Sequence, residues 1–98
     1  MKKIVVLMSI LLGCCLICLL AGGIYIAKNM AQFEYSEGYY LAKKGHYKEA
    51  VDKYTSAIKR EPNEGIYYYY RAMAYEKSGD DNLAAKDKAK AEELGYQK

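Results

Sequence analysis

Residues 45–58 read GHYKEAVDKYTSAI and decide how the polar part of the chain folds. Counted from Tyr47, apolar residues recur at i, i+3, i+4, i+7, i+10 and i+11, which places them on one face of an α-helix. Gly45 stands directly before this helix, where a left-handed glycine ends the helix that precedes it at little conformational cost. The stretch therefore predicts a helix that ends at Gly45, a tight turn and a second, amphipathic helix.

Small residues repeat with a period of 34: Gly45, Ala50 and Ala57 are matched by Gly79, Ala84 and Ala91. A repeat of this length is typical of stacked helical pairs. We therefore expect four antiparallel helices joined by short turns, with residues 33–44 in the first and 81–94 in the last. Asn63 and Asp80 stand where N-caps of the third and fourth helices are expected.

The last expected helix departs from the first repeat. Lys88 and Glu92 stand where Tyr54 and Ile58 stand 34 residues earlier, and residues 86–93 are mostly charged. Repeat arrays need a terminal helix with a polar outer face. We expect residues 81–94 to form such a polar cap.

Residues 31–98 resemble two tetratricopeptide repeats, 31–64 and 65–98. The residues that carry the resemblance are Gly38, Ala50, Tyr54, Ala57 and Pro62, followed by Tyr68, Ala72, Tyr75, Ala84 and Ala91. The resemblance implies that positions 38, 50, 72 and 84 are small because the two helices of a unit cross closely there. It also implies that the aromatic residue of a second helix fills the gap between two neighbouring first helices.

The resemblance further implies a concave groove that holds a partner peptide or helix. Carried over position by position, its lining residues are Tyr35, Tyr39, Lys43, Tyr69, Tyr70, Met73 and Lys77, whereas Tyr68 and Tyr75 are expected to be structural. Tyr and Met suit protein binding because they offer large contact areas with a polar or polarisable tip. The alternative stays open that these rings pack against the membrane helix or a second copy of the chain in a homo-oligomer. A clamp for a C-terminal carboxylate is not expected, because Tyr35 and Tyr39 replace the Lys and Asn that it needs.

Residues 4–27 contain no charged side chain. As a helix they extend over about 36 Å, enough to cross a hydrocarbon core of about 30 Å. Lys2 and Lys3 in the flank 1–3 predict a cytoplasmic N-terminus and a polar domain on the extracytoplasmic side. Residues 28–30 are the expected junction, although the helix could also run on into the first repeat, with Gly22–Gly23 as the place for a bend.

Two processing alternatives compete with a retained span, or signal anchor. Residues 11–14 resemble a lipobox that would lead to lipidation of Cys14, and residues 21–23 resemble a signal-peptide cleavage site. Either would give a lipoprotein or a secreted repeat protein in place of a transmembrane one.

The composition argues against several classes of function: nucleic-acid binding, metal or cofactor binding, and catalysis. Thirteen of the 15 basic and all 12 acidic residues lie in 28–98, so this part carries a formal charge of only +1, and a nucleic-acid partner is not expected. All three Cys lie in the apolar stretch, and the single His46 is expected in a turn, so we expect no metal and no cofactor. No nucleophile motif accompanies the serines. The sequence predicts an all-α, non-enzymatic membrane adaptor or assembly factor that binds a protein partner.

Overall fold

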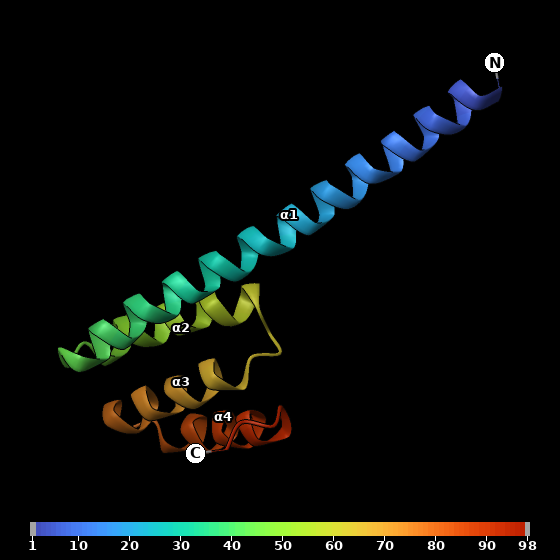
Figure 1. Ribbon diagram of the computed structural model, residues 1–98. Helices are drawn as coiled ribbons and strands as arrows, with labels where there is room; N and C mark the ends of the chain where they lie inside the picture. The colour runs from blue at the N-terminus through green and yellow to red at the C-terminus, as the bar shows by residue number, and fades with distance from the viewer. Residues whose placement is uncertain (1, 98) are drawn as a thin grey trace.

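The computed structural model describes residues 2–97 and is all-helical over that range. Its helices are α1 (Lys2–Lys43), α2 (Tyr47–Arg60), α3 (Gly65–Ser78) and α4 (Asp81–Glu93). Figure 1 shows α2, α3 and α4 beside the C-terminal part of α1, while the N-terminal part of α1 projects alone. The molecule is accordingly elongated, with extents of 69 × 26 × 18 Å. The predicted all-α fold class with a long apolar N-terminal helix is confirmed. The expected membrane helix and the first of the four expected repeat helices form one helix, so the described residues contain four helices.

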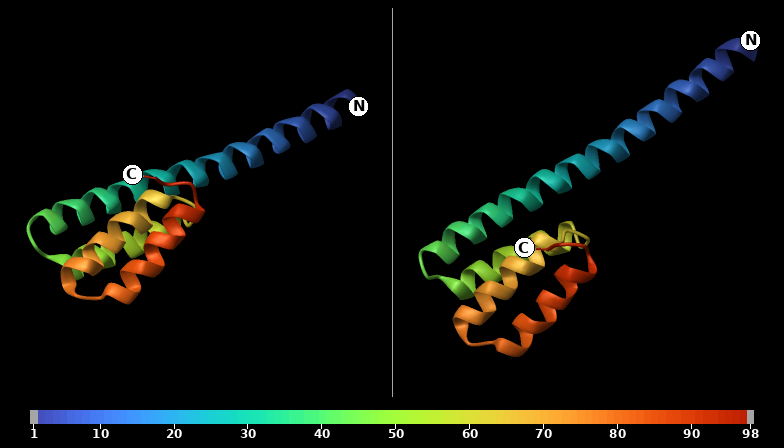
Figure 2. Two further views of the ribbon diagram at one scale, coloured as in Figure 1. Left: turned by 90° about the horizontal axis from the view of Figure 1, so that it is seen from below. Right: turned by 60° about the horizontal axis from the view of Figure 1, so that its bottom comes forward.

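Helix α1 joins the apolar stretch and the first helix of the polar part without a break. Residues 28–30, expected as a junction, are helical, and so are Gly22 and Gly23, the expected place for a bend. Both views in Figure 2 show one continuous rod. The first proline of the chain is Pro62, so nothing before it removes a backbone donor and interrupts the hydrogen-bond ladder.

The N-terminal, apolar part of α1 projects away from α2, α3 and α4 (Figure 1). Its large side chains, from Ile4 at 63% exposure to Ile26 at 63%, are exposed on every side. The helix is long and apolar enough to cross a membrane, and its most apolar window is not buried within the chain.

Three helices, α1, α3 and α4, end in the same way, each followed by a glycine at positive φ: Gly45 (86°), Gly79 (89°) and Gly95 (85°). At the first, the amide of His46 donates to the carbonyl of Leu41 at 2.9 Å, and at the second the amide of Asp80 donates to that of Tyr75 at 2.8 Å. These bonds satisfy carbonyls that the end of a helix leaves without partners. The expectation for Gly45 is confirmed.

The expected helix N-caps are only partly present. Glu64, not Asn63, takes the cap position of α3, so that expectation was wrong. Asp80 does occupy the cap of α4, but its side chain forms no capping hydrogen bond. The α1–α2 and α3–α4 turns are therefore fixed by glycine and backbone bonds rather than by side-chain caps.

The small positions lie where the helices approach most closely. Gly38, Ala50, Ala72 and Ala84 are all buried. A Cβ atom at Gly38 would stand 2.8 Å from the Tyr54 ring, which is fully buried between α1 and α3. Tyr54 thus fills the gap between two neighbouring helices, as expected for that position.

The outer face of α4 is polar, as expected, but one of its charges is not on the surface. Lys88 and Glu92 are exposed, and Lys88 pairs with Glu76. Asp87, counted in the charged run 86–93, is only 5% exposed and pairs with Arg71 of α3. The polar cap expected for residues 81–94 therefore has one charged side chain on its buried face.

Candidate partner-binding groove

A concave cavity of about 330 Å³ lies between α1 and α3, with α2 behind it. We call this cavity the tyrosine groove; its lining residues are Tyr39, Ala42, Lys43, Tyr47, Tyr54, Tyr70, Met73, Ala74 and Lys77. Five of the seven residues expected to line the groove come together here: Tyr39, Lys43, Tyr70, Met73 and Lys77.

Helical spacing explains how two elements bring these side chains to one place. Tyr39 and Lys43 are four residues apart on α1, and Tyr70, Met73 and Lys77 stand at i, i+3 and i+7 on α3, so each set follows one helix face. The Tyr39 and Tyr70 rings meet edge to face, with centroids 5.8 Å apart, and connect the two walls.

Tyr35 was expected in the groove, but it lies outside the cavity. Its ring packs among those of Tyr54, Tyr67 and Tyr70, with centroids 5.9, 5.3 and 5.5 Å away. Burial, together with the neighbouring Tyr70 hydroxyl, raises the pKa of Tyr35 well above its ordinary value. The ring is therefore part of the structural core between α1, α2 and α3.

Tyr69 also lies outside the groove. Its ring contacts Tyr70 at 5.6 Å and Tyr96 at 5.0 Å, and it lines a separate cavity with Lys88 and Glu92 of α4. Consecutive residues of a helix point about 100° apart, so Tyr69 and Tyr70 cannot both face the same hollow.

Two ammonium groups border the tyrosine groove. Lys43 and Lys77 are both exposed, and the Lys43 Nζ lies 5.1 Å from the centroid of the Tyr39 ring. No acidic residue lines this cavity. Within residues 2–97 neither lysine forms an ion pair. The groove thus combines aromatic walls with a cationic rim.

The floor of the groove holds a buried hydroxyl. Tyr54 is fully buried, and among the described residues its Oη has no hydrogen-bond partner. Burial raises the pKa of Tyr54 far above its ordinary value, so the phenol stays neutral. A neutral ring in this place gives the groove an apolar floor.

The structure adds groove residues that the sequence did not indicate. Tyr47 at the start of α2 was counted only as part of the buried face of its helix, yet it is half-buried and lines the cavity. Ala42 and Ala74 give the space that larger side chains would fill. Their size is the one signal in the sequence that could have pointed to them.

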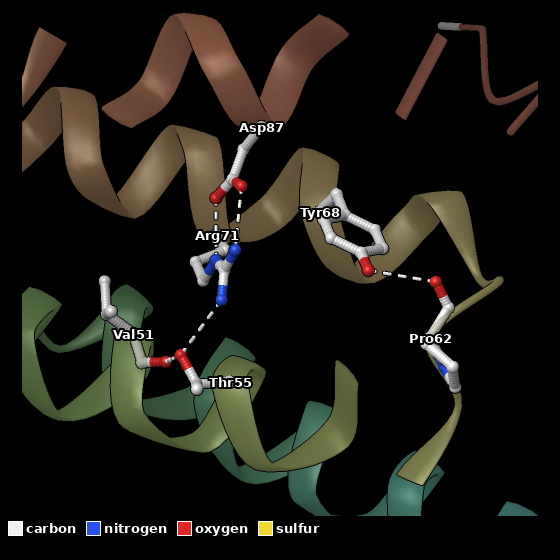
Figure 3. A network of polar contacts seen from close by, with 6 residues as sticks. All are labelled: Val51, Thr55, Pro62, Tyr68, Arg71 and Asp87. Carbon is white, nitrogen blue, oxygen red and sulfur yellow. Dashed lines mark hydrogen bonds and ion pairs between the residues drawn. The ribbon is translucent and has the colours of Figure 1, made fainter. Parts of the chain in front are cut away.

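A polar network behind the groove joins three helices (Figure 3). The Arg71 guanidinium of α3 donates to both carboxylate oxygens of Asp87, at 2.7 and 2.8 Å, and to the Thr55 hydroxyl of α2 at 3.2 Å. Tyr68 and Tyr75, expected to be structural, flank this guanidinium, each ring centroid 5.7 Å from its central carbon. The Tyr68 hydroxyl also donates to the carbonyl of Pro62 at 2.9 Å. Sequence reasoning missed this network.

The remaining candidates lie apart from the groove. His46 occupies the turn before α2, and Cys14 is exposed on the apolar part of α1. The described residues contain no group of three His, Cys, Asp or Glu side chains placed to hold a metal ion. No protein-family model matches this chain.

Proposed function

We propose that the chain is a membrane-tethered, non-enzymatic adaptor of the tetratricopeptide type, which binds a segment of a protein partner in the tyrosine groove. The observation that carries this proposal is the convergence of Tyr39 and Lys43 of α1 with Tyr70, Met73 and Lys77 of α3 around one apolar cavity. Partly exposed aromatic and Met side chains in a concave site are typical of residues that dominate binding energy in protein interfaces.

The apolar part of α1 supplies the tether. Its 24 uncharged residues, exposed on every side within the chain, suit a hydrocarbon environment. Lys2 and Lys3 favour a cytoplasmic N-terminus, which places the groove on the extracytoplasmic side. Confinement to the bilayer raises the effective concentration of a membrane-bound partner, so modest affinity in the groove is sufficient.

The charge of the groove indicates the chemistry of the bound segment. With two lysines on the rim and no acidic residue in the lining, the groove favours an apolar segment that carries an acidic side chain. A basic segment would meet repulsion from Lys43 and Lys77 on both walls.

Site-directed photocrosslinking in native membranes tests the proposal. A benzophenone amino acid replaces Met73 in the groove or, as the control, Tyr40, which is exposed and absent from the cavity lining. We expect an adduct with another polypeptide at position 73 and not at position 40. Equal adducts at both positions, or none at position 73, would contradict the groove assignment. An adduct with the mass of two copies of the chain would favour the homo-oligomer instead.

A further inference from the structure

Beyond Ala27, helix α1 has two unlike faces. One face packs on the domain, where Ala31 is fully buried and Gly38 is buried. The opposite face, which we call the free face, carries Met30 (41% exposed) and Phe33 (59% exposed). These two continue the line of Ile26 at i, i+4 and i+7, with the polar but uncharged Asn29 beside them, so the free face extends one side of the apolar span.

Charged groups begin at different heights on the two faces. On the domain side the first charge is Lys28, which shares a cavity with Glu61 and Glu64 of the α2–α3 turn. On the free face no charged residue occurs until Glu37, about three turns beyond Ile26, and the Glu37 carboxylate reaches round to pair with Lys53 of α2 at 2.9 Å. The helix therefore becomes polar earlier on the side that carries the domain.

From this asymmetry we infer that Met30 and Phe33 lie in the lipid boundary layer while Lys28, Glu61 and Glu64 lie in water, so that α1 leans and carries the domain on its upper side. The inference rests on the proposed transmembrane tether. Lys28 and Phe33 are five residues apart, or about 7.5 Å along the axis, across a helix about 10 Å wide. If the boundary between lipid and water passes between these two side chains, α1 is tilted by about 35–40° from the bilayer normal. This tilt is within the range observed for membrane helices.

The free face suits lipid better than a second protein. It offers two large apolar side chains past Ala27, separated from the next aromatic, Tyr40, by the polar Ser36 and Glu37. A stable protein interface buries at least about 1,000 Å² in total, which needs many more residues than these. Lipid contact at Met30 and Phe33 also continues the contact already expected one turn earlier, because Ile26 on the same face belongs to the proposed membrane span.

Tryptophan fluorescence tests the lean directly, because the chain contains no native Trp. Phe33→Trp and Gln32→Trp each place a single indole in the full chain, reconstituted in phosphatidylcholine vesicles. Gln32 lies one residue closer to the span but on the flank that lines the Lys28–Glu61–Glu64 cavity. We expect lipid brominated in the upper acyl chain to quench Phe33→Trp about twofold more than Gln32→Trp, and aqueous iodide to give the reverse order.

A third variant, Ile17→Trp in the middle of the span, separates the two hypotheses. If deeply brominated lipid fails to quench it, the membrane tether itself is wrong. If Ile17→Trp is quenched but Phe33→Trp is quenched no more than Gln32→Trp, the lean is overturned and the tether stands. A Phe33→Trp indole protected from both bromolipid and iodide would also overturn the inference, because a protein would then cover the free face. Far-UV circular dichroism verifies that each variant keeps its helix content.

Discussion

The contact between Tyr54 and Gly38 links the packing of α1 on α2 to the shape of the tyrosine groove. The Tyr54 ring lies against Gly38 of α1, it is fully buried, and it forms the floor of the tyrosine groove. Rings of Tyr35 and Tyr70 hold it from two sides, at 5.9 and 6.4 Å between centroids. Because the ring cannot move away, the size of the residue at position 38 determines how closely α1 and α2 approach.

Replacing Gly38 by Ala tests this contact. The new Cβ would lie 2.8 Å from the Tyr54 ring, and such overpacking costs about 1–3 kcal/mol, of which the better helix propensity of Ala offsets about 0.5–1. We expect the free energy of unfolding to fall by about 1–2 kcal/mol, measured by thermal melting of the full chain in detergent. In the Tyr54→Leu background the same substitution should cost less; equal costs in both backgrounds would show that the ring is not the cause.

Tyr39 and Tyr40 form a matched pair for testing the proposed binding site. The two residues are adjacent on α1 and both are exposed, but only Tyr39 lines the groove. Tyr39→Ala should weaken partner binding by about tenfold, as truncation of an aromatic anchor usually does, while Tyr40→Ala leaves it unchanged. Binding of the crosslinked partner, once purified, is measured by fluorescence anisotropy. Equal losses in the two variants would place the binding surface elsewhere.

The buried tyrosines predict how stability depends on pH. Burial raises the pKa of Tyr35 and Tyr54 in the folded chain above the ordinary value of about 10. Above that pH the unfolded chain ionises and the folded chain does not, so this contribution is complete below about pH 10 and is lost as the pH rises further. We expect the melting temperature to fall as the pH rises above about 10. The melting temperature should fall less steeply with pH in the Tyr35→Phe/Tyr54→Phe variant than in a Tyr40→Phe control. Identical pH dependence in the two variants would exclude these two phenols as the cause of the fall.

At the scale of elements, Asp87 and Arg71 hold α4 to α3. The carboxylate is 5% exposed and bidentate, and Thr55 extends the contact to α2. α4 itself has little apolar area to contribute, since its buried residues besides Asp87 are Ala84 and Ala91. The ion pair therefore fixes the position of a helix that packing alone holds weakly.

Asp87→Ala should be strongly destabilising because it leaves a partly buried guanidinium without its carboxylate. Loss of one partner of a buried pair costs about 3–5 kcal/mol, a large part of the stability of so small a domain. Glu93→Ala, which removes the exposed Lys90–Glu93 pair at 3.3 Å, is the control and should cost under about 0.5 kcal/mol. Chemical denaturation followed by circular dichroism compares them. Similar costs would mean that Asp87 contributes no more than a surface charge.

Local patterns predicted the elements well. Gly45 and Gly79 ended helices, and the small residues at 38, 50, 72 and 84 marked the close crossings, because these depend on backbone geometry near each residue. The burial of Asp87 was not predictable from a run of charges, since it depends on Arg71, 16 residues away on another helix.

The lining of the tyrosine groove was predicted in part. Tyr39, Lys43, Tyr70, Met73 and Lys77 were carried over from the resemblance to tetratricopeptide repeats, and all five line the cavity. Tyr35 stands one turn before Tyr39 on the same face, so periodicity alone cannot tell them apart. What separates them is their neighbours in the fold. Tyr35 packs against Tyr67 of α3 and lines a different cavity, whereas Tyr39 lies beside the opening of the groove.

For the whole molecule, the continuity of α1 is the property to test. Spin labels at positions 17 and 40, in a chain whose three cysteines are replaced by Ser, should lie about 34 Å apart along one helix. We expect a single narrow distance distribution in vesicles. Asn29→Pro, which removes a helix hydrogen bond and clashes with the preceding turn, should broaden and shorten it, and Asn29→Ala should not. A broad distribution in the unsubstituted chain would contradict a rigid connection.

Because α1 is continuous, the number of residues between its apolar part and the domain determines the direction in which the tyrosine groove faces. Each residue of a helix turns by about 100° and rises by about 1.5 Å. One amino acid added between residues 28 and 30 would rotate the tyrosine groove about the axis of α1 by more than a quarter of a circle relative to the apolar part of the helix. It would move the groove along that axis by only about 1.5 Å. In the proposed membrane-tethered adaptor, such an insertion would turn the groove away from a membrane-bound partner while changing its distance from the membrane by only about 1.5 Å.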